Sequence, residues 1–596
     1  MAVWSFERSV CWGWSFLVPI AAPAASAAST ARVAMSATTM DTQALALPSL
    51  PPSSVYVNLP FCRRRCFYCD FPIKVVGDRP GAAAAAAKPY VDNVVREIRA
   101  TAAAAAIEAP KLPARGGAGG DDTMEHSGRG GGVKTLFFGG GTPSLCPPEL
   151  VGLLIETVRN CYGIAAGAEI SIEMDPGTFD EARLEAFLAL GITRVSMGVQ
   201  SFDAGLLEAC GRAHSLADVY QAVELLRKAK VDNFSIDLMS GLPKQTVEQW
   251  EHTLSEAIAT GAAHISVYDL QVEAGTPFGR WFSPGEAPLP EDETCADMYR
   301  TASGVLGQAG YDHYEISNYA RPGFQSRHNR AYWENVPFLA FGNGAASFVD
   351  GYRFSRPRGL PEYGQWVGEL EEEGWDKATG APRRAACEEV LPGGGGMGDG
   401  AGAEESRPSR EALERDALLD DVMLGFRLKE GLDLRVVASK YGHSAARRVE
   451  EGATEGMRQG WVVRDTAARG SRGGDAGAGG EKGGRNVGRV DDDFVYDGGR
   501  GSSSTLGAGS AAGDVGDHGR TSPGRGFPDD RSGGQEDRRA EVASDGGPRG
   551  EWGTLRLSDP DGFLFSNSVI SSVFCELDGW KRCDQEQDGG VAAADR

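Results

Sequence analysis

The sequence predicts an α/β fold in which a partial, TIM-like (β/α)6 barrel precedes a small second domain. Three observations lead to this prediction. From Ser54 to Arg356, short runs of β-branched and aromatic residues alternate with longer helical runs, which is typical of βα units around a parallel sheet. Six such units fit an open six-stranded barrel better than a closed eight-stranded one. Beyond Arg356, glycine-rich and charged segments interrupt the pattern, and the 596 residues contain 81 glycines.

The barrel elements follow one another as regular pairs along the chain. The predicted strands are Val55–Leu59, Val133–Phe138, Glu169–Met174, Arg194–Val199, Phe234–Met239 and His264–Leu270. The predicted helices are Tyr90–Ala106, Pro148–Cys161, Asp180–Leu190, Leu216–Ala229, Val247–Thr260 and Asp292–Gln308. Several strands end in a polar or glycine-rich turn, which is where parallel sheets and barrels hold their functional sites.

The remaining chain divides by composition. Segments rich in Gly, Asp, Arg and Ser bury too little apolar surface to offset chain entropy, so we expect them to be disordered. The predicted organisation is a targeting or disordered extension at 1–50, the barrel domain at 54–356 with an insertion at 110–132, a disordered insertion at 378–412, a C-terminal domain formed by 413–465 and 551–582, and a second disordered insertion at 466–550.

The charge balance excludes some classes of function. The formal net charge is −23, with 83 acidic and 60 basic side chains. This balance argues against broad electrostatic capture of nucleic acid or of an anionic membrane surface. No uninterrupted run of about 18 apolar residues occurs, so no transmembrane helix is predicted.

The N-terminal segment has the composition of a targeting sequence. Residues 1–50 are rich in Ala, Ser and Thr and contain only two acids, Glu7 and Asp41. That composition is typical of a transit peptide and predicts an organelle, either plastid or mitochondrion. The alternative is an extension without an address on a cytoplasmic protein. The 11 cysteines lack the even spacing of a secreted disulfide framework, which indicates a reducing compartment.

Three cysteines form one tight motif directly after the first predicted strand. Cys62, Cys66 and Cys69 make a CxxxCxxC run. Three thiolates on one loop can bind three irons of a 4Fe–4S cluster and leave the fourth iron open. S-adenosylmethionine (SAM) needs such an open iron, because it binds through its amino and carboxylate groups. A structural zinc site is the alternative, but zinc requires four ligands, and no second cysteine pair or nearby histidine supplies them.

A glycine-rich turn and several polar strand ends complete the predicted site. The turn Gly139–Ser144 (GGGTPS) follows the second strand, where glycines let the backbone approach a ligand closely. A tight strand-to-helix turn without a ligand is the alternative. We expect this turn to meet the methionine end of SAM, and we expect the amine, ribose and carboxylate to be held by Glu173, Gln200, Arg212 and Asp237.

Five motifs together resemble the oxygen-independent coproporphyrinogen III oxidase family of radical SAM proteins. They are Tyr56–Phe61 (YVNLPF), Gly139–Ser144, Ser171–Thr178 (SIEMDPGT), Arg194–Phe202 (RVSMGVQSF) and Ile236–Pro243 (IDLMSGLP). The resemblance covers roughly residues 54–356. It implies a cluster bound by Cys62, Cys66 and Cys69. The SAM contacts that it implies are Tyr56, Tyr68, Gly140, Gly141, Thr142, Glu173, Gln200, Arg212 and Asp237.

Three features distinguish the branches of this family. The decarboxylating oxidase continues its motif as CxxxCxxCxC, whereas Phe71 resembles the haem-chaperone branch. The segment before Tyr56 is of low complexity, whereas the oxidase carries an ordered N-terminal portion there. The run His328–Trp333 resembles the HNxxYW signature of the chaperone branch, and it implies that haem is contacted by His328, Asn329, Tyr332 and Trp333. For His328, a packed and hydrogen-bonded structural role is the alternative.

The C-terminal pieces carry a weaker resemblance. Leu424–Leu432 (LGFRLKEGL) and Asp561–Asn567 (DGFLFSN) are similar to the small helical, winged-helix-like domain of the same family, which predicts a packing domain without chemistry. The run Arg63–Arg65 is interpreted as solvated loop charge, with attraction of haem propionates or of an acidic electron donor as the alternative.

The first hypothesis is therefore a haem chaperone of haem and porphyrin metabolism that carries SAM and a 4Fe–4S cluster. The alternatives are an oxidase that decarboxylates coproporphyrinogen III to protoporphyrinogen IX, and a non-catalytic iron–sulfur scaffold. The chaperone hypothesis predicts a protein that is related to the oxidase but lacks its activity, so no catalytic residue is assigned. The expected partners are haem or a porphyrin, an electron donor and haem-receiving client proteins.

Overall fold

The computed structural model describes residues 52–108, 131–349, 351–373, 410–465, 552–578 and 580. The predicted extension at 1–50 and the predicted insertion at 466–550 lie outside the described residues. The predicted insertions at 110–132 and 378–412 also lie outside them, apart from 131–132 and 410–412. Residues 410–412 belong to a helix, so the C-terminal domain begins slightly earlier than its composition indicates.

All six predicted barrel strands are present as neighbours in one sheet. They are β1 (Ser54–Leu59), β4 (Val133–Gly140), β5 (Ile164–Met174), β6 (Arg194–Gln200), β7 (Phe234–Ser240) and β8 (His264–Asp269). Each pairs in parallel with the next. Their carboxyl ends therefore meet at one edge of the sheet, which brings together residues that are far apart in the sequence.

The sheet continues beyond these six strands at both edges and contains 11 strands in the described residues. Beside β1 lie β11 (Phe338–Phe341), β12 (Ala346–Val349) and β13 (Tyr352–Ser355), and beside β8 lie β10 (Asn318–Ala320) and β9 (Asp312–Glu315). Only β11 pairs in parallel, with β1, and the others pair in antiparallel. The sequence analysis missed them because runs of three or four residues carry too little periodicity to be separated from loops.

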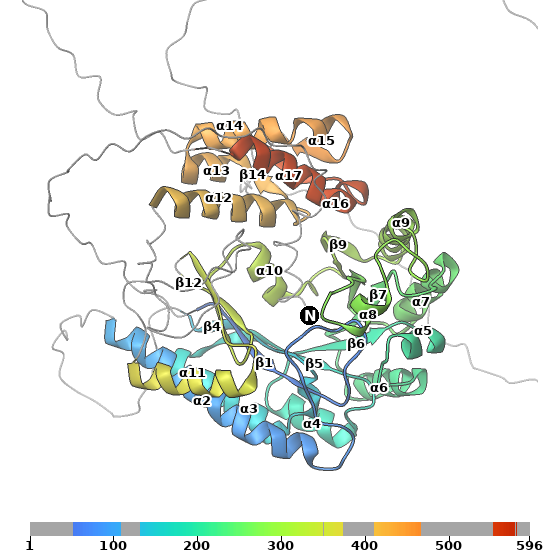
Figure 1. Cartoon of the computed structure of the whole chain (residues 1–596), viewed down its shortest axis with the longest axis vertical. Helices are drawn as coiled ribbons and strands as arrows, with labels where there is room; N and C mark the ends of the chain where they lie inside the picture. The colour runs from blue at the N-terminus through green and yellow to red at the C-terminus, as the bar shows by residue number, and fades with distance from the viewer. Residues whose placement is uncertain are drawn as a thin grey trace, which may run out of the picture. The chain divides into compact units, whose positions relative to one another are not determined.

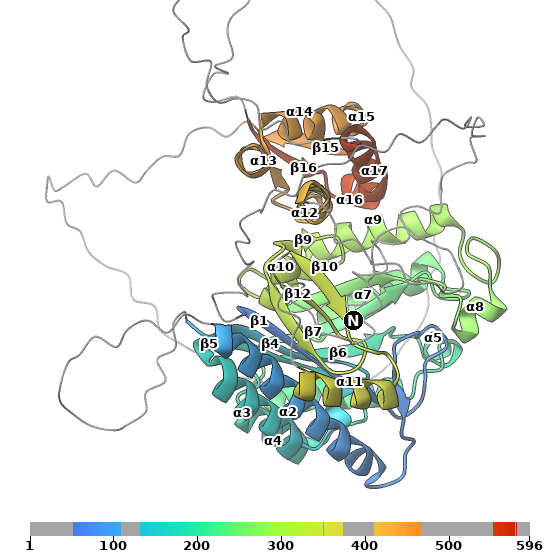
Figure 2. The same cartoon turned by 60° about the vertical axis from the view of Figure 1, so that its left-hand side comes forward.

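Helices cover the outer side of the curved sheet (Figures 1 and 2). The predicted helices correspond to α2 (Ala82–Glu108), α3 (Pro148–Tyr162), α4 (Glu181–Ala189), α6 (Leu216–Lys228), α7 (Val247–Ala259) and α9 (Asp292–Gln308). Helix α2 begins eight residues before the predicted Tyr90, because an alanine run of strong helix formers precedes Pro89. Ser215 and Thr246 start α6 and α7 with capping boxes, which satisfy otherwise unpaired N–H groups.

The two C-terminal pieces share one hydrophobic core. Before the gap in the described residues lie α12 (Arg410–Phe426), β14 (Leu432–Asp433), α13 (Leu434–Tyr441), α14 (His443–Gly452), α15 (Thr454–Arg458) and β15 (Val462–Asp465). After the gap lie β16 (Thr554–Leu557), α16 (Asp561–Leu564) and α17 (Ser566–Leu577). Strand β16 pairs in antiparallel with both β14 and β15. Tyr299 of α9 packs into the same core, which joins this region to the barrel.

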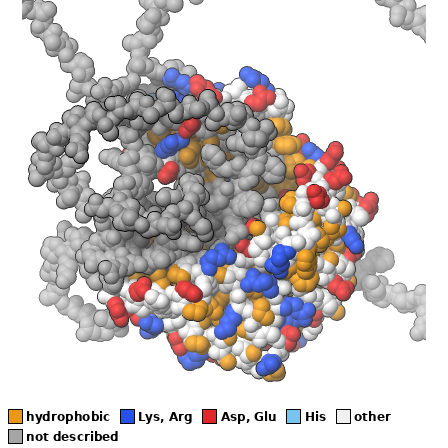
Figure 3. All heavy atoms as spheres, in the orientation of Figure 1, with side chains coloured by type: hydrophobic (Ala, Val, Ile, Leu, Met, Phe, Trp, Pro, Cys, Tyr) orange, Lys and Arg blue, Asp and Glu red, His pale blue; other side chains and the backbone are white. Residues whose placement is uncertain are grey.

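None of the helices in the described residues combines the length and the apolar character needed to cross a membrane. On the face shown in Figure 3, acidic and basic side chains are interspersed among apolar ones over the described part.

Candidate functional site

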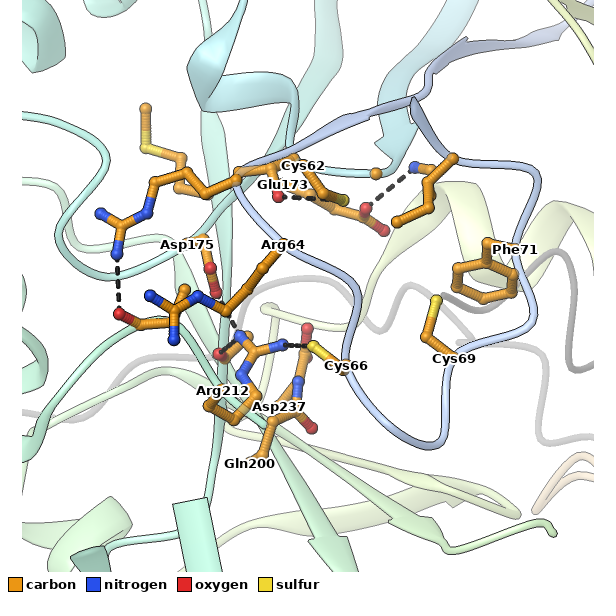
Figure 4. Close-up of a pocket in the computed structure, with 18 of the residues that line it drawn as sticks. Cys62, Arg64, Cys66, Cys69, Phe71, Glu173, Asp175, Gln200, Arg212 and Asp237 are labelled. Carbon is orange, nitrogen blue, oxygen red and sulfur yellow. Dashed lines mark hydrogen bonds and ion pairs between the residues drawn. The ribbon is translucent and has the colours of Figure 1, made fainter. Parts of the chain in front are cut away.

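The three motif cysteines lie on the loop that follows β1. Strand β2 (Phe61–Cys62) ends at the first of them and pairs with β3 (Lys74–Val75), so the loop is closed at its base. The N–H of Phe67 donates to the carbonyl of Cys210 at 3.0 Å, and the N–H of Cys69 donates to the carbonyl of Cys66 at 3.2 Å. The backbone thus holds the three thiols on one side of a pocket (Figure 4).

Two of the three arginines of the motif donate to backbone carbonyls, Arg63 in neighbouring turns and Arg65 within the loop. Arg63 donates to Gly177 at 2.9 Å and to Ala213 at 2.7 Å. Arg65 donates to the carbonyls of Cys69 and Phe71, both at 3.0 Å. Arg63 and Arg65 therefore donate to backbone carbonyls and differ from the expected solvated loop charge, whereas Arg64 is exposed as expected.

The thiols have surroundings that suit a cluster better than a single metal ion. Thr142 lies 3.5 Å from the Cys62 sulfur as a donor, and Arg212 Nη1 lies 3.3 Å from the Cys66 sulfur. Burial raises the pKa of both Cys62 and Cys69 to about 12, so these thiols are protonated at neutral pH until metal displaces the protons. Within the described residues, no three His, Cys, Asp or Glu side chains gather closely enough to hold one ion. A 4Fe–4S cluster takes each of the three thiolates on a different iron, whereas a zinc site requires four ligands on one ion.

Arg212 is the central charged group of the pocket. Its guanidinium forms an ion pair with Asp175 and donates to the carbonyl of Gly198 at 2.7 Å and to the hydroxyl of Tyr68 at 3.3 Å. Burial alone would lower the pKa of Arg212, but Asp175 raises it well above its usual value. Burial would raise the pKa of Asp175, but Arg212 and His214 lower it below its usual value. The pair is therefore charged on both sides at neutral pH.

The glycine-rich turn and the strand ends face the cysteines across the pocket. The N–H of Gly140 donates to Glu173 at 3.0 Å. Gly140 has a φ of +109°, and a Cβ there would lie 1.9 Å from Asn58 Oδ1, so only glycine fits. Asp237 accepts from Ser196 at 3.0 Å and from Ser235 at 3.2 Å, and burial raises its pKa.

Two features of this pocket fit a polar ligand such as SAM. Gln200 has a φ of +72°, a strained conformation for a side chain of this size, and its buried Oε1 has no hydrogen-bond partner among the described residues. The Nε atom of Arg212 is also buried and has no hydrogen-bond partner among the described residues. Buried polar atoms without partners are costly, so a ligand that supplies a donor and an acceptor here would be stabilised.

The pocket brings together all but one of the residues predicted for the cluster and SAM. Its lining includes Cys62, Cys66, Cys69, Tyr68, Gly140, Gly141, Thr142, Glu173, Gln200, Arg212 and Asp237. Tyr56 does not line it and instead packs in a buried aromatic cluster with Phe137. Sequence reasoning missed Asp175, whose role is visible only once its partner Arg212 is placed beside it, although it stands in a quoted motif. Phe71, the residue that distinguished the branches, lines the same pocket.

The HNxxYW signature lies on α10 (Arg327–Trp333), next to a second pocket of about 250 Å³. Asn329, Tyr332 and Trp333 line this pocket, but His328 does not. The two ring nitrogens of His328 lie 2.8 Å from the hydroxyl of Thr135 and 2.7 Å from the hydroxyl of Tyr332. Its ring also stacks on Phe137 at a centroid distance of 5.0 Å. His328 therefore has the geometry of a buried residue that positions Tyr332.

Burial lowers the pKa of His328 to about 3, which has a consequence for stability. An unfolded histidine takes up a proton below about pH 6.5, whereas the folded site stays neutral. The unfolded state then binds more protons, so the free energy of unfolding falls as the pH drops below that value, by up to about 1.4 kcal/mol per pH unit. We expect urea unfolding of a His328→Gln variant, at about pH 7 and about pH 5, to show a weaker pH dependence than the wild type.

The exposed His252 on α7 provides the matched control. A His252→Gln variant should keep the wild-type pH dependence, because it changes an exposed histidine and leaves the buried His328 in place. The buried His264, whose pKa burial also lowers, remains in both variants and contributes equally to them. An unchanged pH dependence in His328→Gln would show that His328 is not held neutral in the folded protein.

Comparison with known proteins shows the family to which the chain belongs. Residues 57–257 match the model of the radical SAM superfamily. The haem chaperone HemW of the cyanobacterium Synechocystis is 44% identical over 383 residues, which are 64% of this chain and 80% of that protein. The chain belongs to the HemW family of radical SAM proteins. The cofactors of this HemW-family chain are accordingly a 4Fe–4S cluster and SAM.

Two further similarities concern the wider family. A zebrafish (Danio rerio) protein named radical S-adenosyl methionine domain-containing protein 1, mitochondrial, is 32% identical over 360 residues, which are 58% of this HemW-family chain and 73% of that protein. The solved structure of the Escherichia coli coproporphyrinogen III oxidase HemN, a radical SAM enzyme, has a TM-score of 0.53 at 22% identity and covers 71% of this chain and 87% of its own. The HemN likeness concerns the fold, and it confirms the predicted α/β class.

Proposed function

We propose that this protein binds haem and passes it on as a haem chaperone, with a 4Fe–4S cluster and SAM bound in the first pocket. The observation that carries the proposal is the 44% identity to the Synechocystis haem chaperone HemW across 80% of that protein. The placement of Phe71 beside the cysteines supports the chaperone branch, because the oxidase has a further cysteine at this position.

The cluster is assigned to the thiolates of Cys62, Cys66 and Cys69, which lie on one loop and face one pocket. When bound, such a cluster supplies the electron that cleaves the sulfonium of SAM. The chain's own groups bind and orient SAM. Arg212 lies next to Cys66 and Tyr68. The turn formed by Gly140, Gly141 and Thr142 allows the backbone to approach the methionine end of SAM closely. Glu173, Gln200 and Asp237 complete the polar wall.

Haem is assigned to the second pocket, next to Asn329, Tyr332 and Trp333. Aromatic side chains there offer flat apolar surface for a macrocycle. His328 holds Tyr332 by a hydrogen bond and does not reach this pocket, so its contribution to haem binding is positional.

The test is anaerobic reconstitution with iron and sulfide, followed by a haem titration and a coproporphyrinogen III assay with SAM and a reductant. We expect saturable haem binding and no protoporphyrinogen IX, since the Phe71 side chain stands where the oxidase has its extra cysteine. Formation of protoporphyrinogen IX would identify an oxidase. Absence of SAM and haem binding in a protein that retains its cluster would leave a scaffold role.

We further propose an organelle as the site of action. The support is the similarity to a protein named as mitochondrial and the transit-like composition of residues 1–50, which lie outside the described residues. The proposed partners are haem or a porphyrin, an electron donor and client proteins that receive haem. Fusion of residues 1–50 to a fluorescent protein tests the address, and diffuse fluorescence throughout the cell would contradict it.

A further inference from the structure

The second pocket is built by both the barrel and the C-terminal region. The barrel contributes Tyr268 and Asp269 at the end of β8, the β9–β10 turn at 315–318 and the signature helix α10. The C-terminal region contributes Arg427, directly after α12, and residues of α16 and α17. Five aromatic side chains line the pocket, namely Tyr268, Tyr299, Tyr332, Trp333 and Phe563. A flat, largely apolar molecule is the class of ligand that such walls accommodate.

Arg427 is a buried cation without a counter-ion in this pocket. It is 5% exposed, and its guanidinium donates to the neutral amide oxygen of Asn567 at 2.9 Å. Its Nε atom has no hydrogen-bond partner, and no carboxylate in the described residues lies within ion-pair distance of it. The face of Trp333 lies 5.9 Å away, which offers only a weak cation–π interaction.

The nearest acidic neighbour does not neutralise Arg427. Glu315 is fully buried, and its carboxylate accepts hydrogen bonds from the side chain of Asn318 and from the N–H of Ser317 instead. Burial raises the pKa of Glu315 to about 7, so its charge is itself incomplete at neutral pH. A buried charge that lacks a partner is costly, and a carboxylate is the group that best satisfies a guanidinium.

The pocket also borders the barrel interior. Tyr268 and Asn329 line both this pocket and a small third cavity, which in turn shares Glu173, Ser196 and Asp237 with the cysteine pocket. The buried Oδ1 atoms of Asn318 and Asn329 have no partner in the described structure. The barrel residues that line the pocket therefore include buried polar atoms without partners, and Arg427 is the cation that the C-terminal region contributes.

We infer that Arg427 is the carboxylate anchor of the second pocket, where it pairs with a propionate of a tetrapyrrole whose flat face lies against the aromatic walls. The inference rests on the proposed haem binding and adds to it the side chain that recognises the propionate groups of the ligand. It also gives the C-terminal region a part in binding, whereas the sequence analysis predicted a packing domain.

The test compares haem with its dimethyl ester, in which neither propionate carries charge. Both are titrated into the reconstituted full-length protein under the same detergent conditions, with the wild type and with Arg427→Gln, Arg427→Lys and the control Arg458→Gln. Arg458 is exposed on α15 and pairs with Glu455, remote from this pocket's lining. Circular dichroism and SAM binding verify that each variant folds.

We expect the wild type and Arg458→Gln to bind haem roughly 10-fold or more tightly than the diester, because a charge-assisted pair is lost on esterification. Arg427→Gln should bind the two ligands equally, and Arg427→Lys should keep part of the preference. Two results would contradict the assignment of Arg427 as the carboxylate anchor without contradicting haem binding. One is equal affinity of the wild type for haem and the diester, and the other is an undiminished preference for haem over the diester in Arg427→Gln. Failure of the wild type to bind either ligand overturns the proposed function and the anchor together.

Discussion

Replacing Cys66 with serine removes the iron–sulfur cluster from the reconstituted protein. The wild type should hold about four irons per chain, and Cys66→Ser should fall to near background, because two remaining thiolates on the loop no longer hold a 4Fe–4S cluster. The loss of iron should abolish SAM binding at the open iron. Iron and sulfide analysis together with the visible absorption of the cluster measures the effect.

Cys575 provides the matched control for this variant. It lies exposed on α17, outside the lining of the cysteine pocket, so Cys575→Ser should retain the full iron content. Serine is close to cysteine in size, and the fold of Cys66→Ser should survive, as circular dichroism can verify. Iron content near the wild-type value in Cys66→Ser would contradict the assignment of the cluster to this loop.

Replacing Arg212 with methionine should abolish SAM binding and destabilise the fold. The change leaves the buried Asp175 without its partner and removes the donor to Gly198, which typically costs about 3–5 kcal/mol of the free energy of unfolding. It also removes the cation beside Cys66 and Tyr68, on the wall proposed for SAM. Urea unfolding and isothermal titration with SAM measure the two effects separately.

Arg227→Met is the control for the loss of an arginine. Arg227 is an exposed residue of α6 that donates to the carbonyls of Ala259 and Thr260, so its replacement should cost no more than about 1 kcal/mol and leave SAM binding unchanged. A double variant that also changes Asp175 to asparagine should recover part of the stability, because the unpaired charge is removed. Undiminished SAM affinity in Arg212→Met would remove Arg212 from the proposed site.

The sequence predicted the barrel strands and the cysteine pocket because both depend on local signals. Each of the six strands is a short run rich in β-branched or aromatic residues, and most of the pocket residues stand in motifs at or after the ends of those strands. The edge strands β9–β13 were missed because they are too short to show a period. The pairings that attach them to the barrel strands involve partners far away in the sequence, namely β11 beside β1 and β10 beside β8.

Residues whose roles depend on burial were harder to predict. Tyr56 stands in a strand motif, but its side chain packs against Phe137 and does not line the cysteine pocket. His328 was expected either to contact haem or to pack. Its hydrogen bonds to Thr135 and Tyr332 and its stacking on Phe137 favour the second role, and these contacts are visible only in the structure. Arg427 gave no local signal, because a missing counter-ion is visible only when all neighbours are in place.

The most direct test of the account is transfer of haem from the loaded protein. The reconstituted chain is saturated with haem, freed of excess ligand and mixed with an excess of a haem-free globin, and the absorption of the two haem complexes is followed. The chaperone account predicts that haem binds stoichiometrically and then moves to the globin, while the 4Fe–4S cluster and SAM stay bound to the chain. Haem that fails to bind, or that stays bound as a resident cofactor, would contradict it.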